Sequence, residues 1–274
     1  MIIELEKQAV YVIADPHRHW GELRQNIENE DVMHDCILVI AGDNKLGFDK
    51  QEVTMNQCEL LNQTLAKKNI IGFMIRGNHD NPSYYDGDKI NMSNLQAIPD
   101  YTILSIGDEN ILCVGGAISV DRVVKQNEYM RKVNCLKSIY PYEEDLEIAK
   151  SKIIRTYWTD EKPVFNITAL ESINSQGTKI SHVITHTSPN FAYITDDTML
   201  NKWYKNDSSL RDDIHEERKV FTNLYAWLLS HEHPLKTWTY GHFHHHNQMN
   251  MGECVFTSLH RCNEIFDYKK IIEE

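Results

Sequence analysis

The sequence has no long apolar run, and this absence limits where the protein can act. Roughly 18 consecutive apolar residues are needed before a segment is read as a membrane-spanning helix, and the chain has no such stretch. The N-terminal residues also lack the basic region and apolar core of a secretory signal peptide. We therefore expect a cytoplasmic protein without a membrane partner.

Cysteine is scarce and does not form paired motifs. The six cysteines are spread over the chain without any CxxC spacing, at Cys36, Cys58, Cys113, Cys135, Cys254 and Cys262. Cys36 and Cys113 lie inside apolar, strand-like runs, where a reduced thiol packs as a small hydrophobic group. We interpret the cysteines as buried structural thiols and expect neither a redox role nor a zinc site from them.

Basic residues are fewer than acidic residues. The chain has 28 Lys and Arg against 40 Asp and Glu, which gives a net charge of −12 without an obvious basic stripe. Proteins that neutralise many phosphates usually carry such a stripe, so we expect no extended nucleic-acid groove. A phosphate-bearing substrate is still compatible with this charge, because two divalent cations can reverse the local field. The oligomeric state stays open.

The hydrophobic residues fit one α/β domain over residues 1–274, because 41% hydrophobic and 25% charged residues are ordinary values for a soluble globular chain. Short apolar runs at 8–14, 36–41 and 70–75 predict buried strands. Between them apolar residues recur at helical spacing, as they do over 53–68. This alternation predicts a parallel βαβ sheet, whose ligands bind beyond the carboxyl ends of the strands.

The later part of the chain is less regular. The pattern predicts a hairpin at 101–106 and 111–114, strands at 180–185 and 237–240, a helix at 208–230 and a polar tail at 267–274. The segment 121–165 is charged, aromatic and weakly periodic, and it fits either an inserted cap or a surface helix and loop.

Five of the predicted strands end in turns rich in metal-binding groups. The turns are Asp15-Pro16-His17, Gly42-Asp43-Asn44, Gly77-Asn78-His79-Asp80, His186 and Gly241-His242-Phe243-His244. Divalent ions take carboxylate, amide and imidazole ligands, and one carboxylate can bridge two ions about 3.5–4 Å apart. Because alternate residues of an extended turn point the same way, we expect Asp15 to converge with His17, and His242 with His244.

In this order the turns resemble the five sequence blocks of the calcineurin-like metallophosphoesterase family: D-x-H, G-D, G-N-H-D/E, H and G-H-x-H. The resemblance implies a four-layer α/β/β/α sandwich with two mixed sheets. It also implies two divalent metal ions, one on Asp15, His17 and His244 and one on Asn78, His186 and His242, with Asp43 bridging both. Mn²⁺ is our first expectation, and Fe, Zn, Ni or Mg are alternatives.

The expected reaction is hydrolysis of a phosphate ester. Two cations would lower the pKa of a bridging water, and the resulting hydroxide would attack phosphorus in line. The resemblance places His79 opposite the scissile phosphate, so His79 would protonate or stabilise the leaving alkoxide. Asp80 and Asp43 are both candidates for orienting the imidazole of His79.

Departures from the family pattern bear on the substrate. Protein phosphatases of this superfamily follow G-D with an arginine that grips phosphate, whereas Gly42-Asp43 continues with Lys45 and no nearby arginine. Lysine lacks the planar fork that binds phosphate bidentately. We therefore favour a phosphodiesterase with a small or nucleotidic substrate over a phosphomonoesterase, and either enzyme over a catalytically inert scaffold.

Three further residues are candidates for substrate contacts. Arg76 precedes Gly77 and could grip phosphate, although a structural ion pair is an equal alternative. Asp121 and Arg122 could border the substrate pocket or begin the inserted helix. A nucleobase could stack on one of four aromatic residues, for which packing is the favoured alternative: Tyr84, Tyr85, Tyr157 and Trp158.

Overall fold

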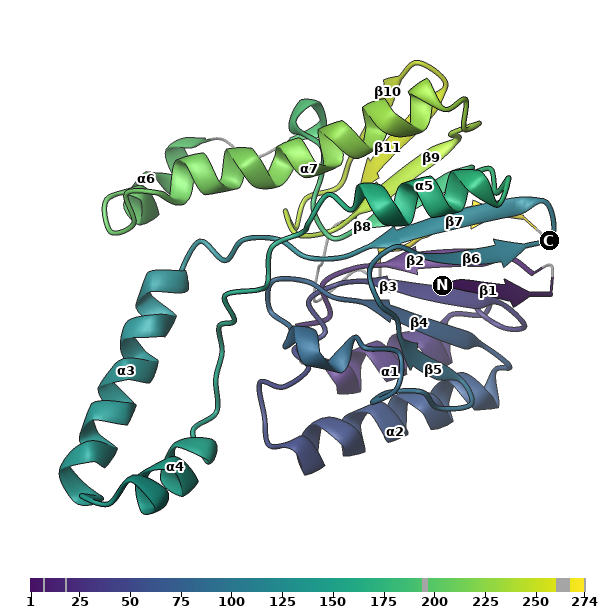
Figure 1. Ribbon diagram of the computed structural model, residues 1–274. Coiled ribbons are helices and arrows are strands. Elements are labelled where there is room, and N and C mark those ends of the chain that lie inside the picture. Colours follow the sequence, from purple (N-terminus) through teal and green to yellow (C-terminus); the bar gives the residue numbers. More distant parts are fainter. Residues whose placement is uncertain (7, 18, 194–196, 260–266, 274) are drawn as a thin grey trace.

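Two β-sheets packed face to face form the centre of the computed structural model, which describes residues 1–273 except 7, 18, 194–196 and 260–266 (Figure 1). The smaller sheet has the order β12-β2-β3-β4-β5; β12 is antiparallel to β2, and all other neighbours are parallel. Its strands are β2 (Val10–Ile13), β3 (Ile37–Ala41), β4 (Ile71–Ile75), β5 (Leu95–Ala97) and β12 (Lys269–Ile272).

The larger sheet has the order β1-β6-β7-β8-β9-β11-β10 and is also mixed. The β6–β7 and β10–β11 pairs are antiparallel, and the remaining neighbours are parallel. Its strands are β1 (Ile2–Leu5), β6 (Thr102–Ile106), β7 (Glu109–Val114), β8 (His182–Thr185), β9 (Thr237–Tyr240), β10 (Asn247–Met251) and β11 (Cys254–Ser258). The predicted hairpin is confirmed as β6 and β7.

Helices cover the outer face of each sheet, which gives four layers (Figure 1). Helices α1 (Trp20–Asn29) and α2 (Gln51–Lys67) pack on the five-stranded sheet, and α5 (Ile167–Ser175) and α7 (Leu210–Ser230) pack on the seven-stranded sheet. A third apolar cluster fills the space between the sheets. The predicted α/β/β/α sandwich with two mixed sheets is therefore confirmed.

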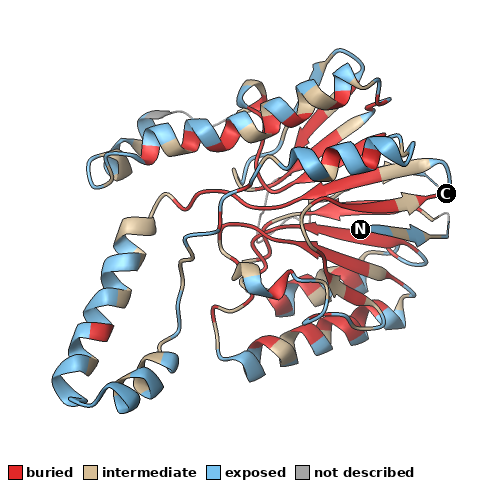
Figure 2. Ribbon diagram, viewed as in Figure 1, coloured by how far each residue is buried: buried red, intermediate tan, exposed pale blue. Residues whose placement is uncertain are grey.

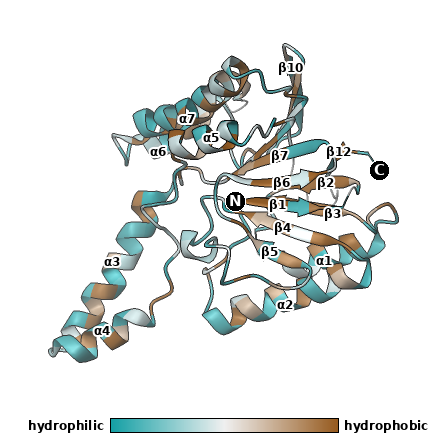
Figure 3. Cartoon of the chain, turned by 45° about the vertical axis from the view of Figure 1, so that its right-hand side comes forward, coloured by the Kyte–Doolittle hydropathy of each residue, from teal (hydrophilic) through white to brown (hydrophobic). Residues whose placement is uncertain are grey.

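The burial of each element explains its sequence pattern. All residues of β2 and β3 are buried because both faces of these strands are covered, so their sequences VYVI and ILVIA do not alternate with polar residues (Figure 2). In α1 the buried residues are Trp20, Leu23 and Ile27, which share one helix face. Helices α2 and α7 also carry both hydrophilic and hydrophobic residues (Figure 3). The buried residues of each helix pack against a sheet.

The segment 121–165 forms two helices that project from the sandwich (Figure 1). These are α3 (Arg122–Ile139) and α4 (Glu143–Ser151), which we call the arm together with the connection that returns to residue 165. Within the arm helices Val133 is the one buried residue (Figure 2). Beside the sandwich, α6 (Asp197–Tyr204) contacts α7.

Two sequence-based expectations were wrong. The polar tail contains strand β12, which pairs with β2 at the edge of the sheet and buries Ile272. Cys135 is exposed on α3 rather than buried, although Cys36, Cys58, Cys113 and Cys254 are buried free thiols and Cys262 lies outside the described residues. None of the described helices is long and apolar enough to cross a membrane.

Candidate metal centre

The seven predicted ligands follow five parallel strands whose carboxyl ends meet at one edge of the sandwich. Asp15, Asp43 and Asn78 follow β2, β3 and β4, whereas His186 and His242 follow β8 and β9. Backbone hydrogen bonds join these loops, from Asp15 N to Gly42 O at 3.2 Å, from His17 N to Asp43 O at 2.9 Å and from Gly241 N to His186 O at 3.1 Å. The fold therefore brings the five turns together, as predicted.

Asp15, His17 and His244 form one group that could hold a metal ion. The Nε2 atoms of His17 and His244 lie 2.8 Å apart. They lie 3.9 Å and 3.8 Å, respectively, from Oδ1 of Asp15. This group is the set that the family resemblance assigns to the first metal.

Asp15, Asp43 and His186 form a second group. His186 Nε2 lies 3.2 Å from Oδ1 of Asp43 and 3.1 Å from Oδ1 of Asn78. The other carboxylate oxygen of Asp43, Oδ2, lies 3.4 Å from Nε2 of His17 in the first group. Asp43 is thus placed between the two groups, and the His242 ring lies beside that of His186, with 5.1 Å between the ring centres.

Five of these seven residues have left-handed backbone conformations. The φ angles are +55° at Asp15, +46° at His17, +58° at Asp43, +70° at His242 and +52° at His244. Residues other than glycine rarely adopt such angles, and each costs on the order of 1–3 kcal/mol. The side chains converge, as predicted, but the expected reason was wrong, because these turns are not extended.

Two glycines allow the candidate ligands to approach the backbone closely. A Cβ atom on Gly42, where φ is +89°, would lie 2.2 Å from Nδ1 of His186. A Cβ atom on Gly77 would lie 2.2 Å from Oδ1 of Asp43. The glycines before Asp43 and Asn78 therefore leave room for ligand side chains, and Gly42 also supplies a backbone angle that suits glycine.

The electrostatics of the centre fit divalent cations. Asp15 and Asp43 are 0% and 1% exposed, an unfavourable state for two neighbouring carboxylates unless positive charge compensates them. Burial lowers the pKa of His17 to about 2, so this imidazole is neutral and has a lone pair for a metal. Burial also acts to lower the pKa of His186, but Asp43 and Asp15 outweigh it and raise that pKa to about 9. The donor set of carboxylate, amide and imidazole groups suits Mn, Fe, Zn or Ni.

Surrounding groups fix the direction of the ligands. His186 Nδ1 donates to the carbonyl of Ala41 at 2.8 Å, which turns Nε2 toward Asp43 and Asn78. Asn78 Nδ2 donates to Ser119 Oγ at 3.1 Å, which leaves its Oδ1 facing His186.

Ser119 is held in turn by Glu161, which the sequence did not single out. The backbone N and the Oγ of Ser119 donate to Glu161 at 2.6 Å and 2.8 Å. Glu161 lies far from Asn78 along the chain, and no local motif marks it. Burial raises its pKa to about 8.

His79 lies beside the two groups, and its contacts differ from those predicted. Its backbone N donates to Asp43 Oδ1 at 2.8 Å, and its ring Nδ1 lies 2.9 Å from Nζ of Lys125 on α3. Asp80, a candidate for orienting this ring, instead accepts from the backbone N of Gly77 at 2.7 Å and of Leu46 at 3.0 Å. Burial lowers the pKa of His79 to about 4, and Lys125 adds to this effect.

The predicted substrate contacts occupy different surroundings. Arg76 is buried and forms an ion pair, which was the structural alternative to a phosphate contact. Its Nη2 lies 2.7 Å from Asp100, and its Nη1 donates to the carbonyl of Glu161 at 2.6 Å. Arg122 is bound by two carboxylates of the α6–α7 region, Asp207 and Asp213, each at 2.5 Å. Both side chains are thus engaged in ion pairs. Of the aromatic candidates, Tyr84 and Tyr85 are buried in the core.

Asp121 does border the site. It precedes α3, pairs with Lys125 at 2.9 Å and lines a cavity of about 320 Å³ together with His79. One wall of this cavity consists of candidate ligands: His17, Asp43, Asn78, His242 and His244. Trp203 of α6 and Arg218 of α7 also line the cavity.

Comparisons with known proteins bear on the fold and on the family of the chain. The TT1561 protein of Thermus thermophilus superimposes with a TM-score of 0.51 at 9% identity and covers 92% of this chain and 88% of its own. Phosphopantetheinyl hydrolase (PptH) from Mycobacterium tuberculosis gives 0.44 at 12% identity, with 98% and 97% covered. No curated protein sequence matches. The family model for calcineurin-like phosphoesterases matches residues 9–246. The chain therefore belongs to the calcineurin-like phosphoesterase family.

Proposed function

We propose that the protein is a dinuclear, metal-dependent phosphoester hydrolase. The observation that carries this proposal is the position of Asp43, whose two oxygens face His186 and His17 in the two candidate ligand groups. In this proposal Asp15, His17 and His244 bind one ion, Asn78, His186 and His242 bind the other, and Asp43 bridges them. Mn²⁺ is the favoured ion for assays, and Fe, Zn, Ni and Mg are alternatives for this mixed donor set.

When bound, two such ions would supply Lewis acidity, which makes water nucleophilic near neutral pH and offsets charge on the phosphate. The protein side chains would handle the leaving group. Lys125 donates a hydrogen bond to Nδ1 of His79, so the neutral imidazole carries its proton on Nε2. That Nε2–H would donate to the oxygen that leaves from phosphorus.

Two lysines would assist phosphate binding where protein phosphatases have an arginine. Nζ of Lys45 lies 4.5 Å from the Phe48 ring centre, and Nζ of Lys125 lies 5.9 Å from the same ring. Burial lowers the pKa of Lys45 to about 8, and Lys125 also lowers it, as expected for neighbouring cations. Lysines act as point charges without bidentate geometry, which is why we favour a phosphodiester, small or nucleotidic, over a phosphoprotein.

We further propose that residues 1–274 form one domain, with the arm as an insertion. The reducing cytoplasm suits the free cysteines Cys36, Cys58, Cys113, Cys135 and Cys254. Phosphomonoesterase activity is the second candidate, because the centre would serve both substrate classes. A scaffold without catalysis is less favoured, since His79 and all seven candidate ligands are present.

Hydrolysis of bis-p-nitrophenyl phosphate and of p-nitrophenyl phosphate tests the proposal. The protein would be stripped of metal and reloaded separately with Mn²⁺, Ni²⁺, Zn²⁺ or Mg²⁺. We expect metal-dependent turnover with a higher kcat/KM for the diester. Preference for the monoester would favour the second candidate, and bound metal without turnover of either compound would favour the scaffold.

A further inference from the structure

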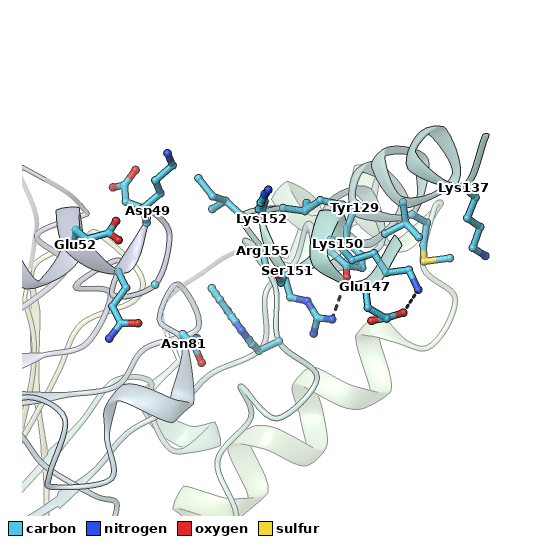
Figure 4. A pocket seen from close by; sticks show the side chains of 18 residues that line it. Asp49, Glu52, Asn81, Tyr129, Lys137, Glu147, Lys150, Ser151, Lys152 and Arg155 are labelled. Carbon is cyan, nitrogen blue, oxygen red and sulfur yellow. Dashed lines mark hydrogen bonds and ion pairs between the residues drawn. The ribbon is translucent and has the colours of Figure 1, made fainter. Parts of the chain in front are cut away.

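A second, larger hollow lies between the arm and the sandwich (Figure 4). This groove has a volume of about 1050 Å³, whereas the cavity at the candidate metal centre has about 320 Å³. One side is formed by the loop after β3 and the start of α2, with Asp49 and Glu52. The other side is formed by α3, α4 and the returning connection, which supply Lys137, Lys150 and Arg155.

The groove collects positive charge on a strongly acidic protein. Its lining has five basic residues against three acidic ones, Asp49, Glu52 and Glu147, although the whole chain has a net charge of −12. Lys50, Lys137 and Lys152 line the groove, and within the described part of the chain no carboxylate lies at ion-pair distance from any of them. Such exposed, unpaired cations suit an anionic ligand.

Aromatic rings connect the groove to the candidate metal centre. Trp158 lines the groove and lies against Phe48, with 5.2 Å between the ring centres. The ring centre of Phe48 lies in turn 5.9 Å from that of His79. The Nζ atoms of Lys45 and Lys125 both lie over Phe48. Trp158 of the groove is thus separated from His79 by one buried ring, so the groove lies next to the candidate metal centre.

We propose that the groove binds a short single-stranded oligonucleotide, one phosphodiester of which lies beside His79. Unpaired lysines along a groove and an accessible indole ring are the combination that binds single-stranded nucleic acid, because the cations follow the backbone and bases stack on aromatic faces. An anionic peptide would use the lysines but not the indole. This inference rests on the proposed function for the cleavage step, in which water adds to phosphorus and the leaving nucleoside oxygen takes a proton.

The proposed role of the groove departs from the expectation drawn from the net charge. Its basic residues are separated in the sequence, at 50, 137, 150, 152 and 155, so they form no stripe that could be seen there. The arm supplies Lys137, Lys150, Lys152 and Arg155 to the groove (Figure 4), and Lys50 lines it from the loop before α2.

Binding is measured by fluorescence anisotropy with a labelled hexathymidylate and full-length, Mn²⁺-loaded His79→Ala protein, which limits cleavage during the measurement. In that background the test variant is Lys137→Glu with Lys152→Glu, both at exposed positions. The matched control is Lys67→Glu with Lys219→Glu, exposed lysines of α2 and α7 that change the net charge equally. Each lost phosphate contact also lowers the salt dependence of log Kd by about 0.7 for a single strand.

We expect the test variant to bind at least about ten-fold more weakly than the control and to have the shallower salt dependence. Equal binding by the two variants would overturn the inference. Competition by polyglutamate as strong as by unlabelled hexathymidylate would also overturn it, since the site would then recognise charge alone. Failure of the proposed function is distinguishable, because it appears as wild-type protein that hydrolyses neither nitrophenyl ester, whatever the binding result.

Discussion

Nζ of Lys125 lies 2.9 Å from Nδ1 of His79, so a helix of the arm contacts the residue proposed to donate a hydrogen bond to the leaving oxygen. The contact fixes which ring nitrogen carries the proton. It also places a cation, with Lys45 nearby, beside the proposed phosphate position. The arm is therefore connected to the proposed chemistry as well as to the groove.

Replacing Lys125 by Met should affect substrates according to their leaving groups. Without the donor to Nδ1, His79 can adopt the other tautomer, which has no Nε2–H to donate a hydrogen bond to the leaving oxygen, so turnover of a substrate with a poor leaving group should fall by about 10²-fold. Esters of p-nitrophenol need little protonation and should lose much less. A series of aryl and alkyl phosphodiesters, compared by kcat, measures the difference.

Lys125→Arg, which retains a donor, should recover part of the loss, and Lys132→Met on the exposed side of α3 serves as the control. An equal loss for all leaving groups would show that Lys125 contributes charge or packing and does not act through His79.

The sequence predicted that the candidate ligands meet, because they follow strands that end at one edge. Asp15, Asp43 and Asn78 follow buried apolar runs, and parallel pairing of those runs brings the turns together. Each motif is local, so a few neighbouring residues suffice to recognise it. The alternation of strand and helix predicted only a parallel sheet, whereas the sandwich of two sheets was implied by the family resemblance.

The missed features depend on contacts between distant segments. Lys125 is separated from His79 by 46 positions and sits on a helix with little apolar periodicity, so no local pattern joins them. Glu161 reaches Ser119 over 42 positions. Strand β12 was interpreted as a tail because four residues with two lysines bury little by themselves and depend on pairing with β2.

Ser119→Ala should weaken binding at the second proposed metal position. The hydroxyl accepts from Nδ2 of Asn78 and links it to Glu161, and loss of such an orienting contact typically costs 10–100-fold in metal affinity. Titration of metal-free protein with Mn²⁺ in a calorimeter should show one weakened binding event and one unchanged. Ser175→Ala, at the exposed end of α5, is the control, and identical isotherms for the two variants would exclude this role of Ser119.

Gly42→Ala should abolish metal binding. Its Cβ would lie 2.2 Å from His186 Nδ1, and the backbone angle of +89° adds strain. Gly177→Ala separates the two effects, because Gly177 has φ of +73° but no atom within 4 Å of the added Cβ. That control should lose about 1 kcal/mol of unfolding free energy and keep its metals. Equal metal content in the two variants, measured by elemental analysis, would refute the steric argument.

Glu161 should make the metal-free protein less stable as the pH rises. Burial raises the pKa of its carboxyl from the usual 4.5 to about 8, despite hydrogen bonds from Ser119. The folded state therefore binds this proton more tightly than the unfolded state, and the stabilisation present below pH 4.5 is lost as the pH approaches 8. Glu161→Gln removes this dependence, so its Tm should rise relative to wild type between pH 5 and pH 9. Parallel Tm curves for the two proteins would contradict the assignment.

The bridging position of Asp43 is tested most directly by electron paramagnetic resonance of the Mn²⁺-loaded protein together with its metal content. We predict two Mn²⁺ ions per chain with a spin-coupled spectrum in the wild type, and Asp43→Asn should lose the coupling and most hydrolysis of bis-p-nitrophenyl phosphate. A wild-type protein that binds one ion, or two ions without coupling, would contradict a dinuclear centre bridged by Asp43.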